Sequence, residues 1–234
     1  MLRLEGVMAG YGATRVLRNF SLSVQEGEMV AVLGRNGVGK TTMLRAAMGA
    51  IPVTSGAVYF KGEDISALPT YERSRRGIAY VPQGREIFPS LTVQENLLVA
   101  VYGTKRGDDK ARLDAVLGEF PVLAEKRHDR GSSLSGGQQQ ILALGRALMT
   151  APRMLLLDEP SEGIQPSIVS RIAEIVRKIH EEQGIAVVIV EQNLDFAASI
   201  APRACVVDKG EVVRDLPSRE VLSDRQLQRE FLGL

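Results

Sequence analysis

The sequence contains a single cysteine, Cys205, and no long apolar run. One cysteine cannot form an internal disulfide, so a compartment that keeps thiols reduced fits this chain. The longest apolar runs, such as Ile185–Val190, are far shorter than the ~20 residues that a membrane-spanning helix needs. The start, Met1–Glu5, leads into mixed polar sequence, so no cleavable signal peptide is expected. A role at a membrane would therefore depend on a partner protein.

The sequence also lacks an excess of charge of either sign. Its 29 Lys and Arg residues are balanced by 28 Asp and Glu residues, which gives a formal net charge of +1. Nucleic-acid binders usually carry a basic excess or a basic stripe. The nearest feature is the cluster Arg73, Arg75 and Arg76, which we interpret as a solvated helix end. We therefore expect no nucleic-acid partner.

The 234 residues, 44% of them hydrophobic and 24% charged, are enough for one α/β domain with a substantial core. Apolar runs and helical periodicity alternate in the outer parts of the chain, which predicts a sheet containing parallel strands with helices on its faces. The block 87–150 is rich in helical pattern and poor in strands, so we expect a helical subdomain inserted into this core. The predicted strands are Leu2–Val7, Val16–Val24, Met29–Leu33, Ala57–Phe60, Ile78–Val81, Met154–Leu157, Ile185–Val190, Ala204–Val207 and Glu211–Val213. Outside that block, the predicted helices are Thr41–Met48, Ser167–Glu182, Asp195–Ile200 and the tail Ser218–Leu234.

Residues Gly34–Thr41, here called the phosphate loop, satisfy the pattern G-x-x-x-x-G-K-[ST] between a predicted strand and a predicted helix. Glycines let successive N–H groups converge on phosphate oxygens, and the helix N-terminus adds partial positive charge. Lys40 is expected to reach the β- and γ-phosphates of ATP, and the Thr41 hydroxyl to ligate Mg²⁺. A glycine-rich turn without function is disfavoured by both flanks. The expected nucleotide contacts are Gly34, Arg35, Asn36, Gly37, Val38, Gly39, Lys40, Thr41 and Thr42.

The apolar run Met154–Leu157 ends in two carboxylates, Asp158 and Glu159. Unpaired charges at the end of a buried strand are costly, and a hard cation such as Mg²⁺ removes that cost. Asp158 is therefore predicted to hold Mg²⁺, and Glu159 to polarise the water that attacks the γ-phosphate. An ordinary strand end with solvated acids is the alternative.

A second predicted helix N-terminus follows Leu134-Ser135-Gly136-Gly137-Gln138, here called the signature turn. Ser135 can cap the helix, and the two glycines expose backbone N–H groups that suit a phosphate. Here the whole chain resembles the ATP-binding cassette (ABC) family, whose signature is LSGGQ. The resemblance implies that the signature turn of one subunit closes over ATP held by the phosphate loop of another, so that two composite sites form in a head-to-tail dimer.

The resemblance also implies a fold and further site residues. We expect a RecA-like P-loop NTPase core, residues 1–86 and 151–234, with an N-terminal antiparallel β subdomain and the helical subdomain 87–150. Tyr11 matches the aromatic residue that stacks on adenine. Gln83 matches the glutamine that contacts Mg²⁺ and the attacking water, and that begins the segment coupled to the membrane partner.

Two positions depart from the family pattern. Gln192 stands where a switch histidine is usual; it can donate a hydrogen bond to the γ-phosphate but has no titratable proton. Gln165 stands where an aspartate usually faces the partner subunit. Because Glu159 is retained, we still expect ATP hydrolysis, with Gln192 and Lys40 assisting. His128 and His180 lie outside these motifs and are predicted surface residues.

The sequence Val190-Glu191-Gln192-Asn193 resembles the ATPases of hydrophobic amino-acid and amide importers. Within that group, Gln83-Gly84-Arg85 and Ile164-Gln165-Pro166 look like the urea-transport branch, whereas the branched-chain amino-acid branch more often has Glu before Gly-Arg. The prediction is therefore an ATPase that drives uptake of urea or short amides, with branched-chain amino acids as the alternative cargo.

The resemblance implies several partners: a second ABC ATPase subunit, two membrane permeases and, indirectly, a periplasmic solute-binding protein. The expected location is the cytoplasmic face of a bacterial inner membrane.

Two other functions stay open. A soluble ABC ATPase acting on DNA or ribosomes is disfavoured because the long insertions and basic arms usual there are missing. A nucleotide-binding regulator without turnover is the other alternative, based on the departures at Gln192 and Gln165.

Overall fold

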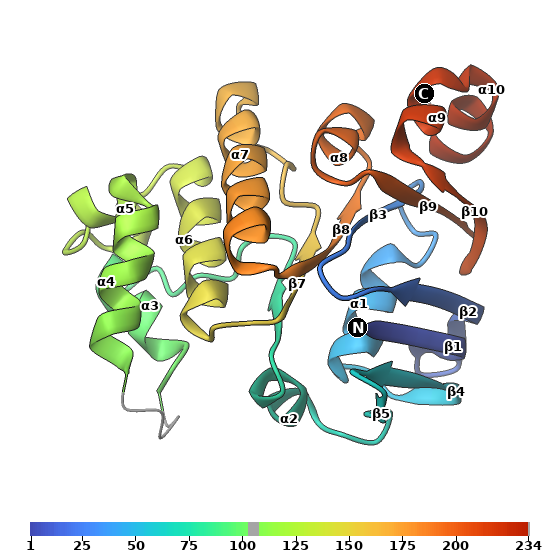
Figure 1. Cartoon of the computed structure of the whole chain (residues 1–234), viewed down its shortest axis with the longest axis horizontal. Coiled ribbons are helices and arrows are strands. Elements are labelled where there is room, and N and C mark those ends of the chain that lie inside the picture. The colour runs from blue at the N-terminus through green and yellow to red at the C-terminus, as the bar shows by residue number, and fades with distance from the viewer. Residues whose placement is uncertain (103–107, 234) are drawn as a thin grey trace.

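The computed structural model describes residues 1–102 and 108–233, which form two β-sheets (Figure 1). The smaller sheet is antiparallel. The larger sheet is parallel except between the two strands nearest the C-terminus of the chain, which pair antiparallel at one edge of the sheet. The smaller sheet has the order β2 (Thr14–Val24), β1 (Leu2–Tyr11), β4 (Val53–Phe60), β5 (Glu63–Asp64). The larger has the order β10 (Glu211–Pro217), β9 (Arg203–Asp208), β3 (Met29–Leu33), β8 (Ala186–Glu191), β7 (Met154–Asp158), β6 (Ile78–Val81).

Helices cover these sheets and extend the molecule to one side. Four of them, α3 to α6, gather on the side away from the antiparallel sheet (Figure 1). The helices are α1 (Lys40–Met48), α2 (Thr70–Arg75), α3 (Val93–Val99), α4 (Asp109–Glu119), α5 (Pro121–Glu125), α6 (Gly136–Met149), α7 (Pro166–Gln183), α8 (Leu194–Ile200), α9 (Ser218–Ser223) and α10 (Arg225–Leu227), with a 3₁₀ turn at Gly131–Ser133 and a π turn at Gln228–Leu232. None of the helices in the described part of the chain is long and apolar enough to cross a membrane.

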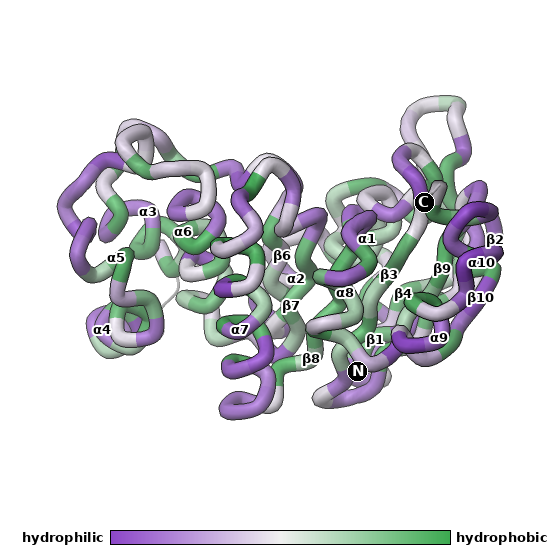
Figure 2. Tube along the Cα trace, turned by 90° about the horizontal axis from the view of Figure 1, so that it is seen from above, coloured by the Kyte–Doolittle hydropathy of each residue, from purple (hydrophilic) through white to green (hydrophobic). Residues whose placement is uncertain are grey.

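The larger sheet is buried on both faces because its central strands β3, β7 and β8 are apolar throughout, except for the acidic residue that ends β7 and the one that ends β8. Val30 and Val32 of β3 pack into the core shared with α1 and the antiparallel sheet. Ala31 and Leu33 pack into the other core, with α6 and α7. Figure 2 shows β3, β7 and β8 as hydrophobic along most of their length. Continuous apolar runs, and not alternation, are the sequence pattern of such strands.

The predicted fold class is confirmed: a P-loop NTPase core with an antiparallel sheet and a helical part. The division at 86/87 and 150/151 stays a prediction, since one hydrophobic core runs without a break from β3 through α3, α4 and α6 to α7. Residues 103–107 of the predicted helical block, and Leu234 of the predicted tail helix, lie outside the described residues.

Several predicted elements have different bounds in the structure. β1 and β4 are longer than predicted because irregularities in register interrupt their alternation, with Gly6 and Gly56 at positive φ. The tail is not one helix but two short helices and a π turn. His128 is exposed as predicted, whereas His180 is half-buried and its Nδ1 lies 3.0 Å from the Ile185 carbonyl oxygen.

The interpretation of the arginine cluster as solvated was wrong for Arg73, which is only 1% exposed. Its guanidinium donates hydrogen bonds to the carbonyl oxygens of Ala46 and Ala47 at 2.8 Å, and to those of Ser66 and Leu68 at 2.9 Å. Two of these carbonyls belong to the C-terminal turn of α1, where such groups lack partners within the helix. Arg73 therefore fixes the end of the helix that begins at the phosphate loop.

Candidate functional site

The phosphate loop connects β3 to α1, as the sequence predicts. Gly37 and Gly39 have φ of 79° and 113°, which a side chain would make unfavourable. Gly34 is required for another reason, because a Cβ there would lie 2.5 Å from the carbonyl oxygen of Val207 on β9. The loop can thus keep its shape only with glycine at these positions.

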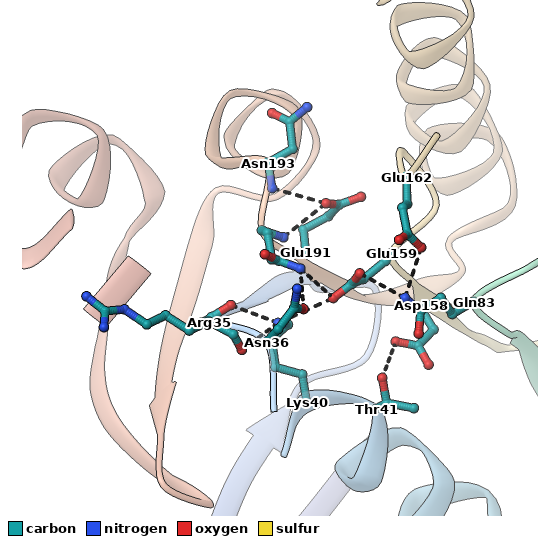
Figure 3. Close-up of polar contacts among 12 residues, drawn as sticks. Arg35, Asn36, Lys40, Thr41, Gln83, Asp158, Glu159, Glu162, Glu191 and Asn193 are labelled. Carbon is teal, nitrogen blue, oxygen red and sulfur yellow. Dashed lines mark hydrogen bonds and ion pairs between the residues drawn. The ribbon is translucent and has the colours of Figure 1, made fainter. Parts of the chain in front are cut away.

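Lys40 begins α1 and is only 4% exposed. Its Nζ donates to the carbonyl oxygens of Gly34 at 2.7 Å and Arg35 at 3.0 Å, and lies 3.3 Å from Oε1 of Glu159 (Figure 3). The ammonium group is therefore held inside the phosphate loop by groups that carry negative charge. A phosphate is a partner of the same kind.

Asp158 ends β7 and is 1% exposed. Its Oδ1 accepts a hydrogen bond from the Thr41 hydroxyl at 3.0 Å, and its Oδ2 accepts one from the Tyr80 hydroxyl at 2.9 Å. Burial raises the pKa of Asp158, and these two hydrogen bonds oppose that rise. Burial and the neighbouring carboxylate likewise raise the pKa of Tyr80. Sequence reasoning missed Tyr80; its place at the penultimate position of β6, beside β7, is the signal that could have found it.

Glu159 receives three side-chain contacts. Its Oε1 accepts from Gln192 at 3.2 Å and pairs with Lys40, while its Oε2 accepts from Gln83 at 3.2 Å. Gln83 also donates to Oε2 of Glu162 at 2.9 Å (Figure 3). The backbone of Glu159 is left-handed, with φ of 45°, and its N–H donates to the Val190 carbonyl at 2.9 Å. Such a conformation is unfavourable for a residue with a side chain, so the surrounding contacts must hold it.

Gln192 joins this group from the loop after β8. Besides Glu159, its side-chain amide contacts Oδ1 of Asn36 in the phosphate loop. The structure thus brings the phosphate loop together with the acidic strand end and the switch glutamine, both of which lie more than a hundred residues further along the chain.

A third buried carboxylate, Glu191, was missed by sequence reasoning. It is 2% exposed, and burial raises its pKa. Oε1 accepts a hydrogen bond from the N–H of Ser161 at 3.0 Å. Oε2 accepts hydrogen bonds from the N–H groups of Gln192 at 3.1 Å and Asn193 at 3.2 Å (Figure 3). It therefore links the loop after β7 to the loop after β8. The signal was available, because β8, like β7, is an apolar strand that ends in an acid.

These groups surround a hollow of about 290 Å³, the phosphate hollow. Its lining comes from the phosphate loop and from residues that meet it across the sheet. The lining residues are Val16, Asn36, Gly37, Gly39, Lys40, Thr41, Thr42, Gln83 and Glu159.

Other predicted contacts lie outside this hollow. Tyr11 lines a neighbouring hollow at the end of β1, and its hydroxyl lies 3.3 Å from Nη1 of Arg45. The Arg35 side chain turns to the C-terminal segment and donates to the Arg229 carbonyl at 2.8 Å. Gln165 is exposed and precedes α7. Val38 packs beside Gly34 and its carbonyl accepts the N–H of Gly210 at 2.8 Å.

The signature turn begins α6, and Ser135 caps this helix as the sequence predicts, within a capping box that Gln138 completes. The Ser135 hydroxyl accepts the N–H of Gln138 at 3.4 Å, and the Gln138 side chain accepts the N–H of Ser135 at 2.9 Å. The described residues that line the phosphate hollow include none from the signature turn. In Figure 1 the strands β6 to β8 lie between α6 and α1. Within one chain, the two features that are predicted to bind phosphate are therefore separate.

Comparisons with known proteins agree with this geometry. The sequence profile of the ABC transporter family matches residues 17–162. BraG of Pseudomonas aeruginosa, a high-affinity branched-chain amino acid transport ATP-binding protein, is 40% identical over 233 residues, covering 100% of both chains. LivF of Archaeoglobus fulgidus, a probable branched-chain amino acid transport ATP-binding protein, is 33% identical, covering 100% of this chain and 99% of that one.

A solved structure matches as well. The ATP-binding cassette MJ0796, a dimer in a post-hydrolysis state bound to ADP and Pi, superposes with a TM-score of 0.82 at 28% identity, covering 94% of this chain and 99% of that one. The match in sequence over the whole length and the match in fold rest on different observations. Together with the phosphate loop, the acidic strand end and the signature turn, they give one answer: the chain belongs to the ABC transporter family and is an ATP-binding subunit that couples ATP hydrolysis to transport.

Proposed function

We propose that this chain is one of two ATPase subunits that drive an importer of branched-chain or similar hydrophobic amino acids. It works at the cytoplasmic face of the inner membrane with two permeases and a periplasmic binding protein. The observation that carries the proposal is the 40% identity to BraG over the full length of both chains. A relative of this length and similarity supports a common role more directly than a fold match does.

The choice of cargo differs from the main prediction made from the sequence. That prediction took the urea branch from Gln83 and from Ile164-Gln165-Pro166, and kept branched-chain amino acids as the alternative. The relatives favour the alternative. Neither motif bears on cargo physically, since both belong to loops around the ATP site, where Gln83 contacts two carboxylates.

The contacts support the following roles at the ATP site. Lys40 exchanges the loop carbonyls and Glu159 for the β- and γ-phosphates. Glu159, then freed from Lys40, accepts a proton from the attacking water, which Gln83 and Gln192 orient. Tyr11 stacks on the adenine from the neighbouring hollow. Arg35, Asn36, Val38 and the glycines supply the backbone and shape of the phosphate cradle.

The residues present fit Mg²⁺. Mg²⁺ is bound in proteins by one or two carboxylates together with substrate phosphates and waters. In residues 1–102 and 108–233, no group of three or more His, Cys, Asp and Glu side chains is suited to a metal. A carboxylate, a hydroxyl and an amide oxygen are offered by Asp158, Thr41 and Gln83: Thr41 and Gln83 line the hollow, and Asp158 accepts a hydrogen bond from the Thr41 hydroxyl. These three residues would hold the ion with the help of ATP, and it would neutralise charge on the phosphates.

The separation of the phosphate loop from the signature turn supports a paired mechanism. A site with a phosphate loop and no second phosphate-binding helix end is a half-site. In the proposed dimer, residues Leu134–Gln138 of one subunit close over the γ-phosphate held by the other, as in the head-to-tail arrangement that the family resemblance implies. The dimeric form of the MJ0796 cassette supports this arrangement.

A groove of about 300 Å³ is the proposed docking site for a permease, and it is called the docking groove below. It runs between α2, the segment after β6, α3 and α6. Its lining includes both apolar and charged side chains: Met48, Thr70, Ser74, Ile78, Ala79, Tyr80, Pro82, Arg85, Glu86, Ala100, Ala143, Arg146, Ala147 and Thr150. Because the segment after Gln83 lines it, a permease seated there can affect the residue that contacts Glu159.

Uptake by the complete transporter tests the cargo. The chain should be co-purified with its permeases and second ATPase, and reconstituted in vesicles with ATP inside and the binding protein outside. We expect ATP-dependent accumulation of labelled leucine and none of labelled urea or acetamide. Accumulation of urea but not leucine would reverse the choice of cargo. Failure to co-purify with any membrane protein would favour the alternative of a soluble ABC ATPase. Co-purification without ATP turnover would favour the alternative of a nucleotide-binding regulator.

A further inference from the structure

The segment after Gln83 has an unusual backbone. Arg85 and Glu86 are consecutive residues with φ of 72° and 46°, a region that residues other than glycine rarely occupy. Two strained residues in a row persist only where surrounding contacts determine them, and such residues cluster at switch regions. The conformation of this segment therefore depends on what holds it.

Helix α6 holds one end of the segment. Arg146 donates to the Glu86 carbonyl at 2.6 Å, and its guanidinium lies 4.8 Å from the centre of the Phe88 ring. Burial lowers the pKa of Arg146. This contact fixes the segment to the third turn of α6.

Arg85 reaches the other end of α6, at the signature turn. Its Nη1 donates to Oε1 of Gln139 at 3.3 Å. A Cβ on Gly136 would lie 3.1 Å from both Nη1 and Nη2, so the guanidinium lies directly against this glycine. A Cβ on Gly163, in the loop after β7, would lie 3.9 Å from Nη2. One side chain thus contacts the signature turn and comes close to the loop after Glu159.

The position of the Arg85 guanidinium beside the signature turn is not explained by a gain in stability of the isolated chain. A helix N-terminus carries partial positive charge, so a guanidinium there is electrostatically unfavourable. Among the residues that the structure describes, Arg85 forms no ion pair with a carboxylate that would offset this. Its planar fork, however, can contact two neighbouring groups at once in a fixed geometry, which a lysine cannot do.

Arg85 also lines the docking groove. We propose that Arg85 is a positioning residue that connects the docking groove to the signature turn, and so controls how the turn closes over ATP bound by the opposite subunit. A permease that moves the strained segment then moves Gly136 and Gln139 through Arg85. The inference rests on the proposed function, because it assumes that the signature turn acts on the other subunit.

The test uses the whole transporter with one of its two ATP sites disabled. Glu159→Gln in one ATPase subunit leaves one active site, built from the phosphate loop of the other subunit and the signature turn of the disabled one. Arg85→Ala is then placed either in the disabled subunit or in the opposite one. If the second ATPase is a different chain, the substitution is made in this chain, and Glu159→Gln or its equivalent is made in each subunit in turn.

We expect Arg85→Ala in the disabled subunit to lower kcat at least tenfold more than the same change in the opposite subunit, with KM for ATP changed less than threefold. Arg85→Lys should show the same preference, since it keeps the charge but loses the fork. Equal losses of kcat in the two arrangements, or a larger loss when Arg85→Ala is in the opposite subunit, would overturn the inference. So would recovery of normal turnover in Arg85→Lys.

Two controls separate possible failures. Arg171→Ala removes an exposed arginine of α7 that pairs with Glu174, and should lower kcat in neither arrangement. Ser135→Arg, in the signature turn itself, must show the arrangement dependence if sites are shared between subunits. If the effect of Ser135→Arg does not depend on the arrangement, the proposed paired mechanism is wrong. If the effect of Ser135→Arg depends on the arrangement and that of Arg85→Ala does not, only the proposed role of Arg85 is wrong. Melting temperatures and unchanged assembly with the permeases exclude unfolding as the cause.

Discussion

Nζ of Lys40 and Oε1 of Glu159 lie 3.3 Å apart at the edge of the phosphate hollow, with both side chains buried. The cation that is proposed to bind phosphate and the proposed base for hydrolysis therefore neutralise each other's charge. Binding of a phosphate gives Lys40 a new partner. The same event leaves Glu159 with its contacts to Gln83 and Gln192, both of which are uncharged donors.

The first prediction concerns Lys40→Ala. The substitution removes two charge-assisted hydrogen bonds to phosphate, each worth ~1.5–3 kcal/mol, so ATP affinity should fall at least ~100-fold. Titration with a fluorescent ATP analogue measures this. Lys178→Ala, which removes an exposed lysine paired with Glu119, is the control and should bind normally. Unchanged affinity in Lys40→Ala would contradict the assignment of the phosphate loop.

The second prediction concerns Glu159→Gln. The amide cannot accept a proton from water, so turnover should fall by ~10²–10⁴-fold while ATP binding is kept. Bound ATP should then hold the subunits in a closed pair, seen as a larger species by light scattering in the presence of ATP. The exposed α7 variant Glu181→Gln should retain turnover. Normal hydrolysis by Glu159→Gln would exclude Glu159 as the base.

Most residues of this candidate site could be named from the sequence because each of its parts is a local pattern. The phosphate loop, the acidic strand end and the signature turn each have a pattern that follows from backbone geometry or the solvation of charge. Tyr80 and Glu191 escaped prediction because their roles depend on partners from other strands, which no local pattern specifies. Arg73 was misread for the same reason, since its partners are carbonyl groups at the end of α1.

The third prediction concerns Glu191, which accepts three backbone N–H groups from two loops. In Glu191→Gln one oxygen becomes a donor and leaves one or two of these N–H groups unpaired, at a cost of ~1–3 kcal/mol. The loop that carries Gln192 should shift, lowering kcat about tenfold with little change in KM for ATP. Steady-state kinetics measure this against Glu174→Gln, an exposed acid of α7. If kcat is unchanged, Glu191 does not position the loops.

The fourth prediction concerns pH and Asp158. Because burial raises its pKa in the folded chain, the folded state binds this proton more tightly than the unfolded state does. The stabilisation is fully present below the unfolded pKa of about 4, and is lost as the pH rises through the folded pKa. Without nucleotide, the stability of the natural chain relative to Asp158→Asn should therefore fall between pH 4 and pH 8.

Urea unfolding of both proteins at several pH values measures this difference. Using the difference removes the contribution of other titrating groups that the two proteins share. A difference that is flat over this range, or that rises with pH, would contradict the raised pKa of Asp158. Added Mg²⁺ and ATP should reverse the trend, since they favour the ionised carboxylate.

The central claim is that each ATP site is shared between two subunits. The most direct measurement is the steady-state ATPase rate per subunit over a dilution series, with the fraction of paired subunits followed by light scattering. The rate per subunit should fall with dilution in proportion to the paired fraction, and approach zero where only single subunits remain. A constant rate per subunit in solutions that contain only single subunits would contradict the shared site.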